Sequence, residues 1–210
     1  MNYNVEQMRN AIQRYRDQTK LKEQQLKNVW DWYKEDVAAE EESRIRGEMR
    51  QQRINAESAL YDAVTAATRQ INKWATLDGN QLTADVRLLD VGVSPEQFQD
   101  LVRKHATNWT MLNALRTWGE AKNAEAAEGA KAAGKIPAAP YNLSTITDPG
   151  ELVAEWKRLY DQACGMLDAI AGVGRYSDAF SRNFMLGTLD NQLATFGRDI
   201  TMLMAVRGMA

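Results

Sequence analysis

The sequence predicts an all-α protein with a long N-terminal helical rod, a three-helix mini-domain and a C-terminal helical hairpin. Apolar residues recur at steps of three and four along two long runs within the first 74 residues, which is the spacing of one helix face. The same spacing returns in shorter segments, which open with residues that favour a helix start. A stretch rich in alanine, glycine and proline separates the last two segments.

The rod is predicted for residues 1–78, with its helix running from Asn4, a candidate N-cap, to Trp74. The first half follows a 3.5-residue repeat in which only Thr19 and Lys22 are weak members. Such a repeat is typical of coiled coils, so we expect this seam to self-associate with a second copy of the chain. The seam consists of Val5, Met8, Ile12, Tyr15, Thr19, Lys22, Leu26, Val29 and Tyr33.

The second half of the rod carries an apolar run from Ile45 to Trp74 that steps by about 3.6 residues, as in a straight helix on a globular core. Between the two runs the apolar stripe fails and Gly47 follows, so a hinge or helix break is predicted at residues 37–47. An uninterrupted solvated helix fits the same stretch. If continuous from Asn4, the helix would be roughly 105 Å long.

Residues 79–126 predict the mini-domain. Ser94, with Pro95 and Gln97 after it, is a strong helix start, and Thr107 or Asn108 can cap the following helix. The side chains expected to face inward are Phe98, Leu101, Val102, His105, Trp109, Leu112, Leu115 and Trp118.

The rest of the chain reads as an Ala/Gly/Pro linker, residues 127–147, and a helical hairpin, residues 148–210. The linker can be an extended tether or a loop that lies over its own protein. A second heptad seam is predicted over residues 186–203. The tail carries Met202 and Met204, and so apolar an end is either tucked into the core or docked on a partner.

The charge is small overall but uneven. A net charge of −2 argues against a protein that mainly neutralises phosphates. Residues 1–34 hold seven basic and four acidic residues, whereas residues 35–48 hold six acidic and two basic ones. This asymmetry favours staggered or antiparallel pairing of rods, although a solvated surface explains it equally well.

The compartment is predicted from cysteine and hydropathy. Cys164 is the only cysteine, so it has no internal disulfide partner and suits a buried, reduced thiol. No signal peptide opens the chain, and no stretch of about 18 apolar residues can span a membrane. We therefore expect a cytoplasmic protein with no membrane partner.

No residue set specifies a reaction, so we expect no enzyme, no cofactor and no metal. One histidine and one cysteine exclude the common zinc patterns, and the consecutive Glu40, Glu41 and Glu42 point in different directions on a helix. His105 is expected to be a structural histidine on an apolar face. Cys164 has no basic neighbour that would lower the pKa of its thiol.

The most informative aromatic cluster is Trp30, Trp32 and Tyr33. Tyr33 lies on the seam and the tryptophans flank it, which favours docking on another protein or covering of the C-terminal hairpin of the same chain. The candidate interface residues are Val5, Met8, Ile12, Tyr15, Leu26, Val29, Trp30, Trp32, Tyr33, Met202 and Met204.

Nucleic acid is the alternative partner. The second and third helices of the mini-domain superficially resemble a helix-turn-helix, but the third offers Arg116 and Lys122 against Glu120 and Glu125, without a basic face. The basic N-terminal arm, residues 1–34, can touch phosphates weakly.

Residues 85–121 contain the runs Val86–Asp90, Ser94–Phe98, Asn108–Leu112 and Leu115–Trp118. The order and composition of these runs resemble a segment of small helical proteins from structural gene clusters of tailed phages and prophages. The resemblance implies a virion or capsid-assembly component with no catalytic residues. We therefore predict a structural interaction protein that self-associates and binds another structural protein, such as a capsid protein, in the host cytoplasm or in the particle.

Overall fold

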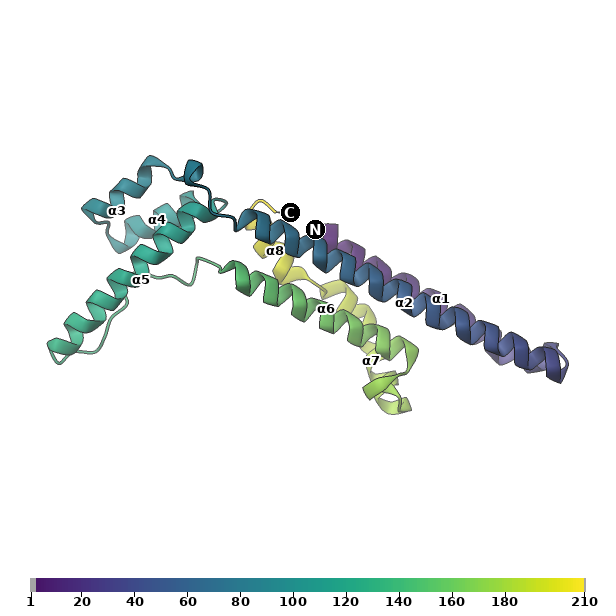
Figure 1. The fold of residues 1–210 in the computed structure, drawn as a ribbon. Helices are drawn as coiled ribbons and strands as arrows, with labels where there is room; N and C mark the ends of the chain where they lie inside the picture. Colours follow the sequence, from purple (N-terminus) through teal and green to yellow (C-terminus); the bar gives the residue numbers. More distant parts are fainter. Residues whose placement is uncertain (1–2, 210) are drawn as a thin grey trace. The chain divides into compact units, whose positions relative to one another are not determined.

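Residues 3–209, which the computed structural model describes, are all-α and contain no strand (Figure 1), which confirms the predicted fold class. They divide into two compact units. Unit 1 comprises residues up to 68 and 154–202, and unit 2 comprises residues 69–153 and those from 203 on. The α-helices are α1 (Tyr3–Trp32), α2 (Glu35–Trp74), α3 (Leu88–Val91), α4 (Pro95–Lys104), α5 (Trp109–Ala132), α6 (Pro149–Ala171), α7 (Ala179–Thr195) and α8 (Arg198–Val206).

The predicted rod is a hairpin. α1 ends at Trp32 and α2 begins at Glu35, so the chain reverses at residues 33–34. Figure 1 shows that the two helices run antiparallel in unit 1. Lys22 Nζ of α1 lies 2.5 Å from a carboxylate oxygen of Glu48 on α2, so the two helices are in contact across the hairpin. The lysine that was a weak member of the heptad seam therefore has a carboxylate partner on α2.

Of the two interpretations of residues 37–47, the hinge or break is wrong and the uninterrupted helix is confirmed, because α2 passes through this range without interruption. The stripe that the sequence lost there continues through Ala38 and Ile45, which pack against Val29 across the hairpin. An alanine is enough here because its small side chain lets two helices approach closely. Glu35 and Asp36 lie in the first turn of α2, where negative charge favours the helix start.

Unit 1 is a four-helix bundle of α1, α2, α6 and α7. On one side, Arg53 of α2 contacts Asp168 of α6 at 2.5 Å. On the other, Arg182 of α7 contacts Glu23 of α1 at 2.5 Å and also donates to the carbonyl oxygen of Ile170 at the end of α6. These contacts make α6 and α7 an antiparallel hairpin on the α1–α2 hairpin.

The core of unit 1 includes the first half of the heptad seam. Most of its residues are aliphatic or alanine, which suits closely spaced helices. The buried apolar residues are Val5, Met8, Ile12, Tyr15, Val29, Ala38, Ile45, Ala56, Leu60, Ala63, Ala67, Trp156, Leu159, Ala163, Met166, Leu167, Ala169, Ile170, Leu189, Leu193, Phe196 and Ile200. Asn4, the predicted N-cap, is also buried and lies inside α1.

The second heptad seam is not one helix. α7 ends at Thr195, and α8 begins at Arg198 after a turn at Gly197. Gly197 has φ +72°, a left-handed conformation, and a Cβ atom there would lie 2.5 Å from Cγ1 of Val5. Glycine satisfies both conditions, because it tolerates positive φ and has no Cβ that would meet Val5 of α1.

Unit 2 contains the mini-domain, and its predicted helix starts are confirmed. Ser94 and Gln97 form a reciprocal capping box at α4, and the Asn108 side chain accepts from Met111 N at the start of α5. The core of unit 2 contains a stacked aromatic pair, Trp118 and Phe98, with 6.0 Å between the ring centroids. α5 continues to Ala132, beyond the predicted end of the mini-domain.

The packing of unit 2 corrects the start of the predicted linker and decides between its two interpretations. Residues 127–132 belong to α5, and Tyr141, Leu143 and Ile146 pack against the core around Phe98. The Tyr141 hydroxyl donates to the carbonyl oxygen of Val93 at 2.9 Å. The second half of the linker is therefore a loop that covers its own protein, because it carries apolar side chains that a free tether would leave in water.

Candidate protein interface

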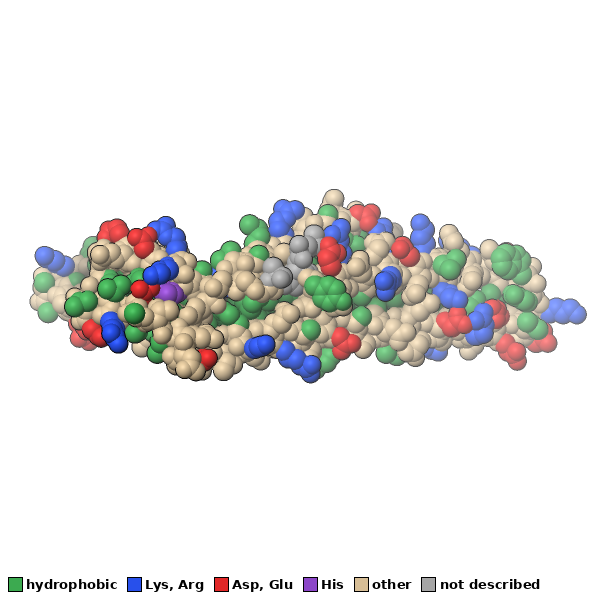
Figure 2. Space-filling view, turned by 90° about the horizontal axis from the view of Figure 1, so that it is seen from above, with side chains coloured by type: hydrophobic (Ala, Val, Ile, Leu, Met, Phe, Trp, Pro, Cys, Tyr) green, Lys and Arg blue, Asp and Glu red, His purple; other side chains and the backbone are tan. Residues whose placement is uncertain are grey.

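Four large apolar side chains lie exposed where the α1–α2 hairpin turns: Trp30, Trp32, Tyr33 and Val37, which we call the hairpin tip. Their exposed fractions range from 44% for Tyr33 to 67% for Trp32. Figure 2 shows hydrophobic side chains gathered at that end of the hairpin, among basic and acidic ones. Single exposed apolar residues are normal, but several large exposed ones at one end of a hairpin are typical of a protein interaction site.

The chemistry of the tip is set by α2 as well as α1. Trp30 Nε1 donates to Glu42 Oε2 at 2.9 Å, and Arg46 Nε donates to the other oxygen of Glu42 at 2.7 Å. The hydrogen bond from Arg46, followed by that from Trp30, lowers the pKa of Glu42. The indole of Trp30 is thus oriented by a charged acceptor although half of it faces solvent.

The hairpin is thin at this end. Between Leu26 and Met49, which we call the distal hairpin, only Val29, Ala38 and Ile45 are buried. Most helical stability in proteins comes from packing of an apolar face, and two helices with three buried side chains have little of it. The distal hairpin therefore has little packing of its own.

The structure separates the eleven predicted interface residues into two groups. Val5, Met8, Ile12, Tyr15, Val29 and Met204 are buried within the chain, and Leu26 is partly buried. The seam is therefore part of the core of unit 1, and its predicted role as a surface between copies is corrected, because α2 supplies the second helix that the heptad pattern requires. Trp30, Trp32, Tyr33 and Met202 are exposed.

Sequence reasoning missed a second apolar surface in unit 1. Phe180 and Phe184, four residues apart on α7, are 81% and 68% exposed, and Val173 before α7 is 42% exposed. The sequence did indicate this surface. The apolar three-four spacing in α7 begins only at residue 186, so the two phenylalanines precede the stripe that faces the core. Aromatic residues that stand outside an apolar stripe are candidates for the surface.

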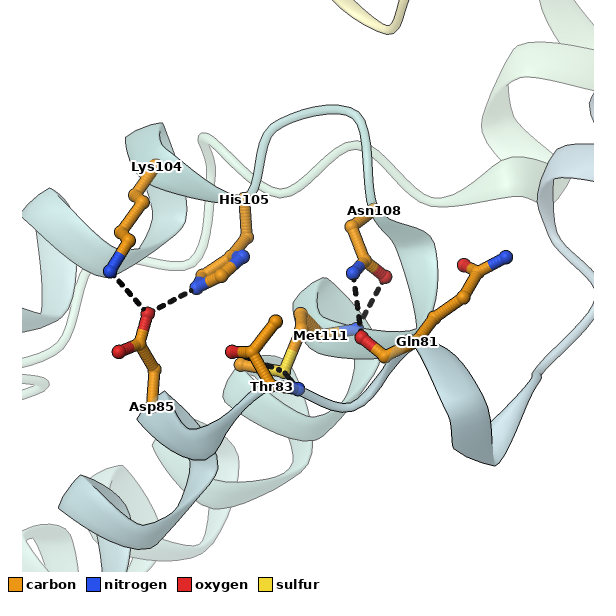
Figure 3. Close-up of polar contacts among 7 residues, drawn as sticks. All are labelled: Gln81, Thr83, Asp85, Lys104, His105, Asn108 and Met111. Atoms are coloured by element: carbon orange, nitrogen blue, oxygen red, sulfur yellow. Dashed lines mark hydrogen bonds and ion pairs between the residues drawn. The ribbon is translucent and has the colours of Figure 1, made fainter.

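The single histidine belongs to a structural contact of unit 2 (Figure 3). His105 Nε2 and Lys104 Nζ each lie 2.7 Å from Asp85 Oδ2. The hydrogen bonds from Lys104 and then His105 lower the pKa of Asp85. Asn108 donates to the carbonyl oxygen of Gln81 at 2.8 Å in the same region. These contacts tie residues 81–85 to the ends of α4 and α5.

The single cysteine has surroundings that oppose nucleophilic chemistry. Cys164 lies half-buried on α6 in unit 1, and burial raises the pKa of its thiol. Tyr160 is its hydrogen-bond partner, and burial together with that contact raises the pKa of the Tyr160 hydroxyl to about 12. A reactive thiol needs the opposite, an environment that stabilises the thiolate. Cys164 and His105 belong to different units.

Some of the side chains that suggested nucleic-acid binding are engaged in contacts within the chain. In the basic arm, Arg9, Arg16 and Lys22 form ion pairs with Glu6, Asp190 and Glu48. The first turn of α5, which would enter a DNA groove in a helix-turn-helix, is Trp109–Met111, and its side chains are buried. Arg14, Lys20, Lys27 and Lys34 are exposed.

Comparisons with known proteins identify no relative. No family model matches the sequence, and no curated protein or solved structure matches the chain. Within residues 3–209, no three His, Cys, Asp or Glu side chains are grouped so that they could hold a metal ion. In the same range, every helix is too short or too polar to cross a membrane.

Proposed function

We propose that the protein is a non-enzymatic structural protein that docks on another protein through the hairpin tip. The observation that carries this proposal is the exposure of Trp30, Trp32, Tyr33 and Val37 at the end of a thin two-helix projection. Tryptophan and tyrosine are the residues that most often anchor protein interfaces. The distal hairpin also has a small core, so a partner would stabilise it.

The setting we propose is a phage particle or its assembly in the host cytoplasm. It rests on the resemblance of residues 85–121 to proteins of phage structural gene clusters, together with the all-α fold. The partner is then another structural protein, such as a capsid protein. Self-association remains part of the proposal, but through exposed residues, because the heptad seam is internal to unit 1.

The test is site-specific photo-crosslinking in cells that produce the protein. Trp32 is replaced with a photo-reactive phenylalanine derivative, and Tyr61, an aromatic residue on α2 that is 62% exposed, receives the same replacement as the matched control. We expect a discrete protein adduct from position 32 and none from position 61, with the adduct identified by mass spectrometry. The absence of an adduct at position 32, or equal adducts at both positions, would overturn the proposal.

A further inference from the structure

Arg207 stands immediately after α8, in unit 2, with only 6% of its surface exposed. Among residues 3–209 it is the only Lys, Arg, Asp or Glu that is buried. Arginine is rarely buried unless it is paired, because taking a guanidinium out of water without a partner is strongly unfavourable. A buried guanidinium such as that of Arg207 is therefore expected to have a negatively charged partner.

The described part of the chain supplies Arg207 with neutral partners only. Nη2 donates to Thr147 Oγ1 at 2.8 Å and to the carbonyl oxygen of Thr145 at 3.4 Å. Nε is buried without an acceptor, and burial lowers the pKa of the guanidinium. No carboxylate of residues 3–209 forms an ion pair with it, whereas the part-buried Arg116, also in unit 2, is paired with Asp148.

Arg207 also lines a hollow of about 680 Å³ in unit 2. Lys73 lies on its wall together with Trp74 and Thr107, and no acidic residue lines it. Lys73 is exposed and has no ion pair within residues 3–209. The indole of Trp74 is held by a 2.9 Å hydrogen bond to the carbonyl oxygen of Thr107, so the hollow has a fixed aromatic side chain. The lining of this open hollow therefore includes two cationic residues, one of them buried, and an aromatic residue.

We propose that this hollow binds the oxyanionic group of a small organic molecule, a carboxylate or a phosphate ester. The anion would supply the negative charge that Arg207 lacks, because guanidinium donors form strong charge-assisted hydrogen bonds with such groups. Lys73 adds a second positive charge at the rim. The organic part of the ligand would lie against Trp74. This site is in unit 2, and it is independent of the hairpin tip in unit 1.

The test is isothermal titration of the full chain with phenyl phosphate and with benzoate, at constant ionic strength set with chloride. The two probes distinguish a phosphate from a carboxylate. We expect saturable binding of at least one of them. Arg207→Gln should weaken that binding more than about tenfold, since a hydrogen bond to a charged group is lost. Lys73→Gln should weaken it by up to about fivefold, as for an exposed ion pair.

Two controls keep the result interpretable. Arg87→Gln replaces an exposed arginine of unit 2 that does not line the hollow, so affinity should not change. Lys73 is exposed, so its variant tests the site even if Arg207→Gln disturbs the fold, which thermal unfolding without ligand would reveal. Absence of saturable binding by either probe overturns the proposal. So does unchanged affinity in both Arg207→Gln and Lys73→Gln, and in either case Arg207 only ties α8 to the 145–147 loop.

Discussion

The two ends of the α1–α2 hairpin in unit 1 carry the same heptad pattern but differ in what covers it. At the base, α6 and α7 pack on the hairpin, and Val5, Met8 and Ile12 have no exposed surface. At the tip, the same stripe ends at Tyr33, which is 44% exposed, and the flanking Trp30 and Trp32 are each more than half exposed. The difference shows that a heptad seam predicts a buried helix face. The seam does not indicate whether the helix that buries this face belongs to the same chain or to another protein.

The largest effect that would test this comparison comes from one aspartate placed at either end. Ile12→Asp should lower the free energy of unfolding by at least about 3 kcal/mol, because an unpaired carboxylate would be buried in the bundle. Trp32→Asp should change it by no more than about 0.5 kcal/mol, as for an ordinary surface substitution. Urea unfolding followed by circular dichroism measures both.

The same pair of variants has a clear contrary result. If Ile12→Asp unfolds at the same urea concentration as the unsubstituted chain, the base of the hairpin is not covered by α6 and α7. If Trp32→Asp is destabilised as strongly as Ile12→Asp, the tip is packed and cannot be a free docking surface.

Two glycines give a second, smaller contrast between base and tip. Gly197→Ala should destabilise unit 1 by about 1–3 kcal/mol, since alanine is strained at φ +72° and its Cβ would meet Val5. Gly47→Ala in the distal hairpin should stabilise by about 0.5–1 kcal/mol, because nothing lies within 4 Å of the new Cβ and alanine favours a helix. Thermal unfolding of the two variants under identical conditions measures both signs. A stabilised Gly197→Ala variant would contradict the close approach of α1 to the turn.

Local features of the fold were predictable from the sequence, and long-range ones were not. The capping box of Ser94 and Gln97 depends on neighbouring residues, so the sequence alone locates the start of α4. The reversal at Tyr33 and Lys34 carries no glycine or proline and depends on which helix covers the stripe. For residues 141–146 the sequence left a tether and a covering loop open, because their apolar side chains find partners only in the folded unit.

The candidate sites divide in the same way. The exposed aromatic residues of the tip could be predicted because Trp30 and Trp32 flank the heptad positions rather than occupy them. Phe180 and Phe184 were missed because the prediction followed the stripe and ignored the residues beside it. Arg207 gave no local signal, since its hydrogen-bond partners Thr145 and Thr147 are distant in sequence.

The smallest effect is a titration at the tip. The hydrogen bonds from Arg46 and Trp30 lower the pKa of Glu42 from an ordinary value of 4.5, so these contacts are present above that pH. They should be lost as the pH falls through the lowered pKa, which is the usual sign for a depressed carboxylate. The resonance of the Trp30 indole N–H should therefore shift with a midpoint below 4.5, and Glu42→Gln should abolish the shift. A midpoint at or above 4.5 would mean that Glu42 does not hold the indole, and the tip would then lack the side-chain order that distinguishes a preformed docking surface from a frayed hairpin end.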